Sequence, residues 1–468
     1  MASPQQQLLA RIPSVEVLLH EAQAQDWATT VPRRALVEAV RAAVDGARDT
    51  LLRTAGNDAD AATLRQAILA DAQKRVEAAA GPYYRKVINA TGIILHTALG
   101  RAVLPRQAID QIAAELTGYS LLQADLASGQ RSRRDGRIEE LLQQLTGAEA
   151  ATVVNNNAAA TSIVLNTVAR AKEVIVSRGQ LVEIGGSFRL PDVMAQSGAK
   201  LVEVGTTNKT HARDYEQAIA PDTAAILRVH PSNYKISGFT SEVPLADLVR
   251  IAHDRGIVVI DDVGAGPLVD FSRFGFDKEP TLQESVQTGA DLITASADKL
   301  IGGSQGGIIL GRAPLIQAVR KNPFSRIVRV GKLTLAALEA TLRLFLDESQ
   351  ALREVPTLRM LCRGLADIAA QAERMAQAIA GQTAAAAVTT AEGFSQMGSG
   401  SLPTQNLATL VVAITPHAMA PGELALRLRS RRPPIFTRVH HGQVLVDPRT
   451  LLEGEEEVLI ETLVEVLR

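Results

Sequence analysis

The 468 residues are 46% hydrophobic and 21% charged, a balance that is ordinary for a globular protein of two or three domains. The net charge of −1 excludes a general electrostatic attraction to nucleic acid, so such a partner would require a local basic patch. The single cysteine, Cys362, excludes an intramolecular disulfide. No apolar run reaches the ~18 residues of a membrane span, and the N-terminus lacks a secretory signal pattern. We therefore expect a cytoplasmic protein with no membrane partner.

The first predicted elements are helices, which we expect to form a separate module over residues 1–80. Apolar residues recur at three- and four-residue spacing in segments 14–23, 33–53 and 60–80. Ser14 is a typical helix cap, and the last segment stops at Gly81-Pro82. No strand pattern lies between these segments.

From Tyr83 onward, short β-rich runs alternate with helical runs. Aromatic residues make up only 3% of the chain, so Ala, Val, Leu and Ile must build the core, which suits an α/β protein. The alternation predicts a mostly parallel central sheet covered by helices on both faces, in a large domain over residues 81–335. The expected strands lie within 87–95, 151–155, 173–179, 199–208, 223–233, 257–266, 291–299 and 306–311.

A second, smaller α+β domain is predicted at the C-terminal end. A long helical stretch after Lys332 is expected to connect the two domains, so we place the last domain at residues 336–468. This domain mixes a helical segment, 358–381, with strands at 406–414 and 442–447. The stretch "GFSQMGSGSLPTQ", residues 393–405, is predicted to be a loop before the first of these strands.

Two strand ends in the large domain carry polar residues that suit a ligand. In "VVNNNAAATSIVL", a strand ends at Asn155 and a helix follows, so the backbone near Asn156, Asn157 and Ala158 can bind a phosphate. The simpler interpretation is that Asn only caps the helix. In "AILRVHPSNYK", His230 can stack on a planar ring and Asn233 can donate to a ring oxygen, or this segment is merely a turn.

Two further strand ends carry ionisable groups. In "IVVIDDVGAG", one acid at the end of a buried strand can hold a protonated pyridine nitrogen, and strand alternation allows only one of the two to face it. We choose Asp262 over Asp261, because the spacing of Asp262 and Gly264 resembles the pattern of aminotransferase-like enzymes. In "SADKLIGGSQGGIILG", Lys299 precedes a glycine-rich turn, and Ser296 can share a phosphate with the helix end. Lys299 is interpreted as a Schiff-base lysine rather than a solvated surface amine. No metal site is predicted.

In this order, the four features resemble aminotransferase-like pyridoxal-phosphate enzymes of fold type I. Longer stretches resemble a narrower family, the bacterial selenocysteine synthases, or L-seryl-tRNA(Sec) selenium transferases. The resemblance covers nearly the whole chain and is carried by "RIPSVEVLL", "INATGIILHTALGRAVLP", "VHPSNYKISGFT", "SADKLIGGSQGGIILG" and "NPFSRIVRVGKLTLAALEATL".

The resemblance implies a homo-oligomeric transferase, a ring of dimers, that uses pyridoxal 5'-phosphate. It would convert L-seryl-tRNA(Sec) to L-selenocysteinyl-tRNA(Sec) through an aminoacryloyl intermediate, with selenophosphate as the selenium donor. Lys299 matches the family's Schiff-base lysine and Asp298 its neighbouring aspartate. Arg101, Arg326 and Arg329 match the arginines of the selenophosphate pocket, and the spacing of the last two predicts one face of a helical turn.

The N-terminal module resembles the family's tRNA-docking domain, although a solvated helix face explains its charges equally well. Two other functions stay open. One is a pyridoxal-phosphate lyase that acts on a small amino acid or sugar acid without tRNA, and the other is a non-catalytic tRNA-binding protein. The basic residues of the N-terminal module are Arg33, Arg34, Arg41, Arg48 and Arg53. The sequence departs from the family pattern at Ala98, Ala297, Ser304 and Gly331.

Overall fold

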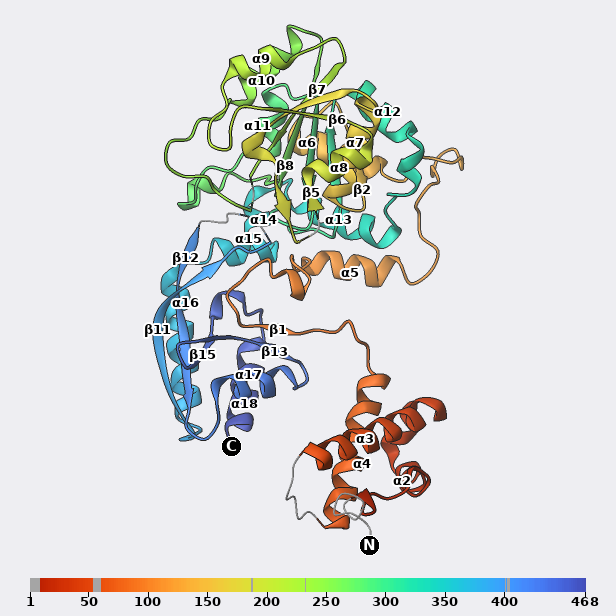
Figure 1. The fold of residues 1–468 in the computed structure, drawn as a ribbon, viewed down its shortest axis with the longest axis vertical. Helices are drawn as coiled ribbons and strands as arrows, with labels where there is room; N and C mark the ends of the chain where they lie inside the picture. Colours follow the sequence, from red (N-terminus) through yellow and green to blue (C-terminus); the bar gives the residue numbers. More distant parts are fainter. Residues whose placement is uncertain (1–8, 54–59, 187, 232, 400, 402–404) are drawn as a thin grey trace. The chain divides into compact units, whose positions relative to one another are not determined.

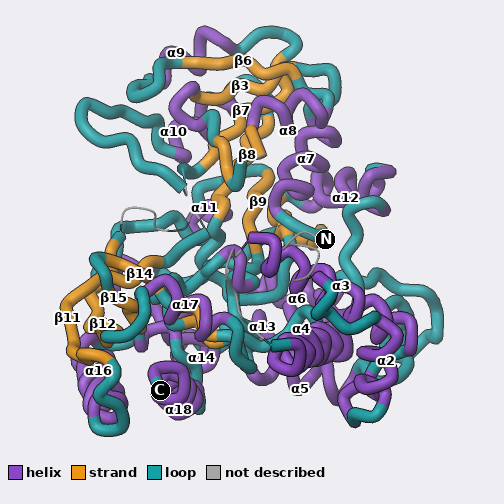
Figure 2. The backbone as a smooth tube through the Cα atoms, turned by 60° about the horizontal axis from the view of Figure 1, so that its bottom comes forward, coloured by secondary structure: helices purple, strands orange, loops and turns teal. Residues whose placement is uncertain are grey.

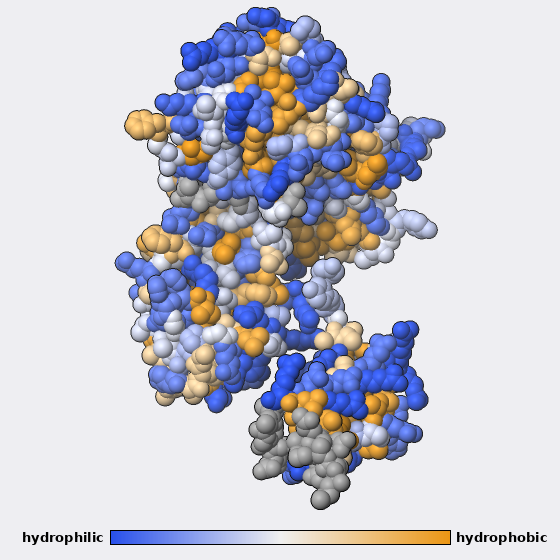
Figure 3. All heavy atoms as spheres, viewed as in Figure 1, coloured by the Kyte–Doolittle hydropathy of each residue, from blue (hydrophilic) through white to orange (hydrophobic). Residues whose placement is uncertain are grey.

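The computed structural model describes residues 9–53, 60–186, 188–231, 233–399, 401 and 405–468. The chain divides into two compact units, Met1–Lys86 and Val87–Arg468 (Figure 1). Within the described ranges, no helix combines the length and the apolar character needed to cross a membrane. On the face that Figure 3 shows, polar residues alternate with apolar patches on both units.

The N-terminal unit is helical, as its hydrophobic periodicity predicts. Leu36, Val40 and Val44 form one buried stripe that packs in the unit's core with residues of the other helices. The hydroxyl of Ser14 caps the first helix by accepting a hydrogen bond from the backbone N–H of Val17. The elements are α2 (Val15–Gln23), the 3₁₀-helix η1 (Asp26–Thr30), α3 (Arg33–Arg53) and α4 (Ala61–Ala80).

The larger unit is built on a seven-stranded sheet, which confirms the predicted α/β fold. All neighbouring strands pair in parallel except β10, which is antiparallel to both of its neighbours. Strands β2, β9 and β10 are buried at every residue, as expected for a sheet covered on both faces. The strand order is β2 (Ala150–Val154), β10 (Gly307–Gly311), β9 (Leu292–Ser296), β8 (Val258–Gly264), β7 (Thr223–Val229), β3 (Glu173–Ser177) and β6 (Lys200–Val204).

Helices cover both faces of this sheet, and Figure 2 shows α7, α8 and α12 on one side with α9 and α10 on the other. Apolar residues alternate along the strands, so that Val174 and Val176 pack on the first side and Ile175 on the second. The first side carries α7 (Asn157–Val168), α8 (Leu190–Ser197) and α12 (Ala313–Lys321). The other side carries α6 (Gly136–Thr146), α9 (Ala212–Ala218), α10 (Leu245–His253), α11 (Leu282–Gln287) and α13 (Lys332–Leu344), and α5 (Arg106–Glu115) packs on α13.

The C-terminal part is an antiparallel sheet with its own core, and two sequence predictions there need correction. The segment 87–95 does not join the central sheet, because β1 (Ile88–Asn89) pairs with β13 (Ile435–Phe436). The predicted loop at 393–405 begins later, because β11 continues to Gln396. The sheet order is β11 (Ala386–Gln396), β12 (Asn406–Pro416), β15 (Gln443–Val446) and β14 (Arg438–His440). The helices that share its core are α16 (Leu365–Ala380), α17 (Pro421–Arg429) and α18 (Glu455–Leu467), whereas α14 (Glu348–Glu354) and α15 (Pro356–Leu361) pack in the core of the central sheet.

Candidate active site

A cavity of about 810 Å³ lies where several strands of the central sheet end. Strands β2, β7, β8 and β9 all direct residues into it from their carboxyl ends, which is where ligands bind in sheets of this kind. Its lining includes these predicted site residues: Arg101, Asn156, Asn157, Ala158, His230, Asp262, Ser296, Asp298 and Lys299.

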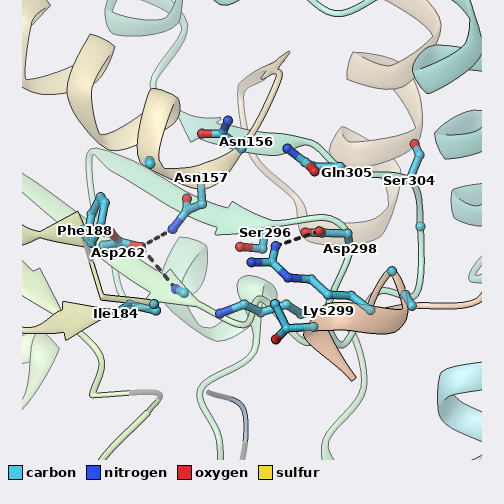
Figure 4. A pocket seen from close by; sticks show the side chains of 18 of the residues that line it. Asn156, Asn157, Ile184, Phe188, Asp262, Ser296, Asp298, Lys299, Ser304 and Gln305 are labelled. Atoms are coloured by element: carbon cyan, nitrogen blue, oxygen red, sulfur yellow. Dashed lines mark hydrogen bonds and ion pairs between the residues drawn. The ribbon is translucent and has the colours of Figure 1, made fainter. Parts of the chain in front are cut away.

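Lys299 lies just after β9, and its side chain is only 6% exposed (Figure 4). Burial lowers the pKa of its amine, and the nearby positive charge of Arg101 lowers the pKa further. The turn that follows is tight, since Gly302 has φ of +73° and a Cβ there would lie 2.4 Å from a side-chain carbon of Val355. A buried amine with a lowered pKa is a good nucleophile toward an aldehyde.

Arg101 and Asp298 form an ion pair beside this amine. The guanidinium Nη1 of Arg101 donates to Oδ2 of Asp298 at 2.8 Å, and the carboxylate is 9% exposed (Figure 4). Arg101 itself has φ of +63°, a left-handed conformation that non-glycine residues rarely adopt. The two members of the pair act on Lys299 in opposite directions, since the charge of Arg101 lowers the pKa of the amine and the charge of Asp298 raises it.

The two neighbouring acids of β8 face opposite sides of the sheet, as strand alternation requires. Asp262 lines the cavity and is 5% exposed. Its carboxylate accepts hydrogen bonds from Asn157 Nδ2 at 2.8 Å, Thr161 Oγ1 at 2.9 Å and the backbone N–H of Gly264 at 3.2 Å. Burial nevertheless raises its pKa, since the penalty on the charged form exceeds the effect of these donors.

Asp261, by contrast, is fully buried away from the cavity. Its carboxylate accepts hydrogen bonds from Arg228 Nη1 and from Ser285 Oγ, both at 2.7 Å. These two partners account for both of its oxygens, so Asp261 has a structural role and Asp262 is the acid that faces the cavity.

The N-terminus of α7 forms one wall of the cavity. Asn156 is its N-cap, and the side-chain Oδ1 accepts a hydrogen bond from the N–H of Ala159 at 2.9 Å. The first-turn residues Asn157 and Ala158 line the cavity, so the helix end presents backbone donors to an anion. Gly307 allows β10 to approach this end closely, because a Cβ there would lie 2.1 Å from the carbonyl oxygen of Asn156. Asn156 therefore caps the helix, and the same helix end can also bind an anion.

His230 and Asn233 have different positions. His230 lines the cavity, and its Nε2 lies 2.8 Å from Glu279 Oε2, a partner that the sequence analysis does not identify. Asn233 lies in an adjoining cavity, and its Nδ2 donates to the carbonyl oxygen of Glu183 at 2.9 Å. Asn233 therefore does not line the main cavity in this conformation.

Arg326 and Arg329 do not lie with Arg101. Arg326 ends the short 3₁₀-helix η5 (Pro323–Arg326), whereas Arg329 forms an antiparallel bridge with Val154, so the predicted shared helical face is wrong. Arg329 lines a second cavity of about 310 Å³, together with Arg134. Burial lowers the pKa of Arg134, and the positive charges of Arg329, Arg131 and Arg326 lower it further. Four arginines thus form one cationic cluster outside the main cavity.

Some site residues were missed from the sequence. Thr161 donates to Asp262 from a position four residues after Asn157, so helical periodicity could have identified it once α7 was placed. Ile184 and Phe188, from the β4 (Glu183–Ile184) and β5 (Phe188–Arg189) hairpin, close another side of the cavity (Figure 4). No local pattern marks these two.

The chain is similar to known families and proteins over most of its length. A family model described as L-seryl-tRNA selenium transferase matches residues 87–452, and one described as selenocysteine synthase N terminal matches residues 9–48. The L-seryl-tRNA(Sec) selenium transferase of Solidesulfovibrio magneticus is 47% identical, and the match covers 96% of each chain. The enzyme of that name from Desulfomicrobium baculatum is 45% identical with the same coverage.

Among solved structures, a D-glucosaminate-6-phosphate ammonia-lyase is similar with a TM-score of 0.56. It is 22% identical, and the match covers 82% of this chain and 96% of the lyase chain. At this level of identity the likeness supports the fold alone.

Proposed function

The chain belongs to the L-seryl-tRNA selenium transferase family, and we propose that it converts L-seryl-tRNA(Sec) to L-selenocysteinyl-tRNA(Sec) with pyridoxal phosphate bound at Lys299. The observation that carries this proposal is that a buried amine, Lys299, and a buried carboxylate, Asp262, line one cavity beside a helix N-terminus. These are the groups that a phosphorylated pyridine aldehyde requires.

The residues of the cavity fit this cofactor. The first turn of α7 at Asn157 and Ala158 would hold the phosphate, with Ser296 close by in the lining. Asp262 would bind the ring nitrogen, because a buried carboxylate with a raised pKa is stabilised by a cationic N–H partner. Lys299 supplies the amine, and His230 would lie against the ring.

When bound, pyridoxal phosphate supplies an electron sink for the serine α-carbon. Lys299 Nζ, whose pKa is lowered by burial, would be the group that accepts the α-proton and returns a proton later. Asp262 would keep the ring nitrogen protonated, and this would favour loss of the serine hydroxyl. The Arg101–Asp298 pair borders the same space, but it carries little net charge by itself, so Arg101 would bind an anionic reactant only together with further cations.

We propose selenophosphate as that reactant, with Arg326 and Arg329 as further ligands. The cationic cluster around Arg329 supports an anion site, since like charges held together favour a multiply charged anion. In one chain this cluster lies outside the Lys299 cavity. We therefore propose that the chain assembles as a homo-oligomer, in a ring of dimers, in which a second copy completes the donor pocket.

The N-terminal unit is proposed to dock the tRNA. Arg34 pairs with Glu38 and Arg48 with Asp45, so these two charges are partly neutralised. The remaining arginines of α3, which are Arg33, Arg41 and Arg53, are exposed and form no ion pair with the described residues. Exposed guanidinium groups on one helix are suitable partners for phosphates. An aminoacyl-tRNA substrate also favours a cytoplasmic location.

The test is incubation of the purified protein with seryl-tRNA(Sec), pyridoxal phosphate and selenophosphate, followed by analysis of the esterified amino acid. Selenocysteinyl-tRNA should form, and borohydride should attach the cofactor to the peptide that contains Lys299. Attachment at Lys235 or Lys332 would refute the site. Elimination from a free amino acid without any dependence on tRNA would favour a small-substrate lyase instead.

A further inference from the structure

A third cavity, of about 430 Å³, adjoins the one that contains Lys299. The two share part of their lining, namely Thr97, Arg101, Ile184 and Gly185, so a ligand can extend from one into the other. The rest of the third cavity comes from Asn233 and from the segment after β11, with Gln396, Met397, Gly398, Ser399, Ser401 and Gln405. We call this cavity the Gln396 subsite.

Two independent observations indicate that the Gln396 subsite binds a ligand. Ser401 is 2% exposed, and its Oγ has no hydrogen-bond partner among the described residues, although buried hydroxyls are normally paired. Ser399 has φ of +49°, and Arg101, which also lines this cavity, has φ of +63°. Strained non-glycine residues tend to gather at functional sites.

The subsite is polar but almost uncharged. Among its described lining residues, Arg101 is the only charged one, and Asp298 already neutralises it at 2.8 Å. A free amino acid presents a carboxylate, which requires an available cation when it is desolvated. An amino acid esterified to a ribose presents an uncharged carbonyl and hydroxyl groups instead. The electrostatics of the subsite therefore suit the ester and not the free acid.

Gln396 is positioned to recognise such hydroxyl groups. Its backbone is fixed, because its N–H donates to the carbonyl oxygen of Gly92 and its carbonyl accepts from the N–H of Ile94, both at 2.9 Å. Its side-chain amide has donors and an acceptor, which match the dual character of a sugar hydroxyl. The unpaired hydroxyl of Ser401 adds a second such group to the cavity.

We propose that the Gln396 subsite binds the terminal ribose to which the serine is esterified, and that Gln396 and Ser401 make its specific contacts. This inference rests on the proposed function, because it assigns one part of the aminoacyl-tRNA substrate. It explains how one cavity can select an esterified amino acid over the free amino acid.

The test compares two unreactive ligands of the cofactor-loaded, full-length protein. One is 3'-alanylamido-3'-deoxyadenosine, which carries the ribose, and the other is alaninamide, which does not. Neither has a hydroxyl on the β-carbon, so binding is measured without elimination, by calorimetry or by the change in cofactor absorbance. The wild type should bind the ribose-bearing ligand more tightly than alaninamide.

Gln396→Leu and Ser401→Ala should each weaken binding of the ribose-bearing ligand by about tenfold and leave alaninamide binding unchanged. The matched control is Gln377→Leu, an exposed position of α16 outside the subsite, which should change neither. Ser401→Ala removes a single oxygen, so it remains informative if Gln396→Leu does not fold.

Equal binding of the two ligands by the wild type overturns the inference, as does a variant that weakens both ligands alike. These results are distinguishable from a failure of the proposed function. In that case the wild type would not convert seryl-tRNA(Sec), whatever its preference between the two ligands.

Discussion

Replacing Asp262 with asparagine should weaken cofactor binding and stop the reaction while the protein still folds. The carboxylate accepts three hydrogen bonds, from Asn157, Thr161 and the N–H of Gly264, and an amide can preserve only part of this set. The charge that would pair with a pyridine N–H is lost entirely. A charge-assisted hydrogen bond contributes about 1.5–3 kcal/mol, which corresponds to roughly 10- to 100-fold in affinity. We expect Asp262→Asn to weaken cofactor binding by that factor and to stop loss of the serine hydroxyl.

The assay is a titration with pyridoxal phosphate followed by absorbance, together with thermal unfolding of the unliganded protein. Asp261→Asn is the matched control, because its side chain pairs with Arg228 and Ser285 on the opposite face. This control should lower the midpoint of unfolding, since weakening a buried ion pair is costly, but should leave cofactor affinity unchanged at permissive temperature. The assignment would be refuted if Asp262→Asn kept wild-type cofactor affinity and turnover. It would also be refuted if Asp261→Asn lost cofactor affinity while Asp262→Asn lost only thermal stability.

Three further predictions concern the arginines. The rate at which the cofactor attaches to the unliganded protein should rise with pH, with a midpoint below 10.5. Arg101→Gln should move that midpoint upward, because Arg101 lowers the pKa of Lys299. An unchanged midpoint in the pH–rate profile would contradict this. Arg329→Ala should reduce selenium incorporation by roughly tenfold or more while loss of the serine hydroxyl continues, measured as two separate products; failure of both steps together would exclude a donor role. Replacing Arg33, Arg41 and Arg53 with alanine should weaken tRNA binding and reduce its salt dependence by about 0.9 per lost phosphate contact, and unchanged binding would count against docking by α3.

Much of the central sheet was predictable because its strands carry their own signal. Segments such as 257–266 are short apolar runs followed by polar residues at the carboxyl end, and in a parallel sheet such ends converge on one edge. That rule alone brings Asn157, Asp262 and Lys299 together, as the cavity lining confirms. Alternation also predicts that only one of Asp261 and Asp262 faces this edge, whereas the choice of Asp262 rests on the resemblance of its Asp-Val-Gly spacing to the aminotransferase-like pattern.

The errors occur where long-range contacts decide the structure. The segment 87–95 has a strand-like composition, but nothing local tells Ile88 to pair with Ile435, 347 positions away, rather than with the central sheet. The spacing of Arg326 and Arg329 fits a helix, yet the bridge from Arg329 to Val154 ends the helical turn after Arg326. The glycine and serine residues around Gln396 predict a loop, whereas pairing with Asn406 extends β11 to Gln396.

The electrostatics of the cavity favour a ligand between Asp262 and Lys299. Burial raises the pKa of Asp262, so this carboxyl stabilises the fold below its ordinary pKa of 3.8, and that stability is lost as the pH rises through the folded value. Burial lowers the pKa of Lys299, so its contribution is present above 10.5 and is lost as the pH falls through the folded value. At neutral pH each group therefore opposes folding. A ligand with a cationic N–H would relieve the cost of burying the charged carboxylate of Asp262. If the same ligand formed a covalent bond to Lys299 Nζ, it would also relieve the cost of burying a charged amine. Charges that the fold by itself stabilises poorly would thus contribute to the affinity for the proposed cofactor.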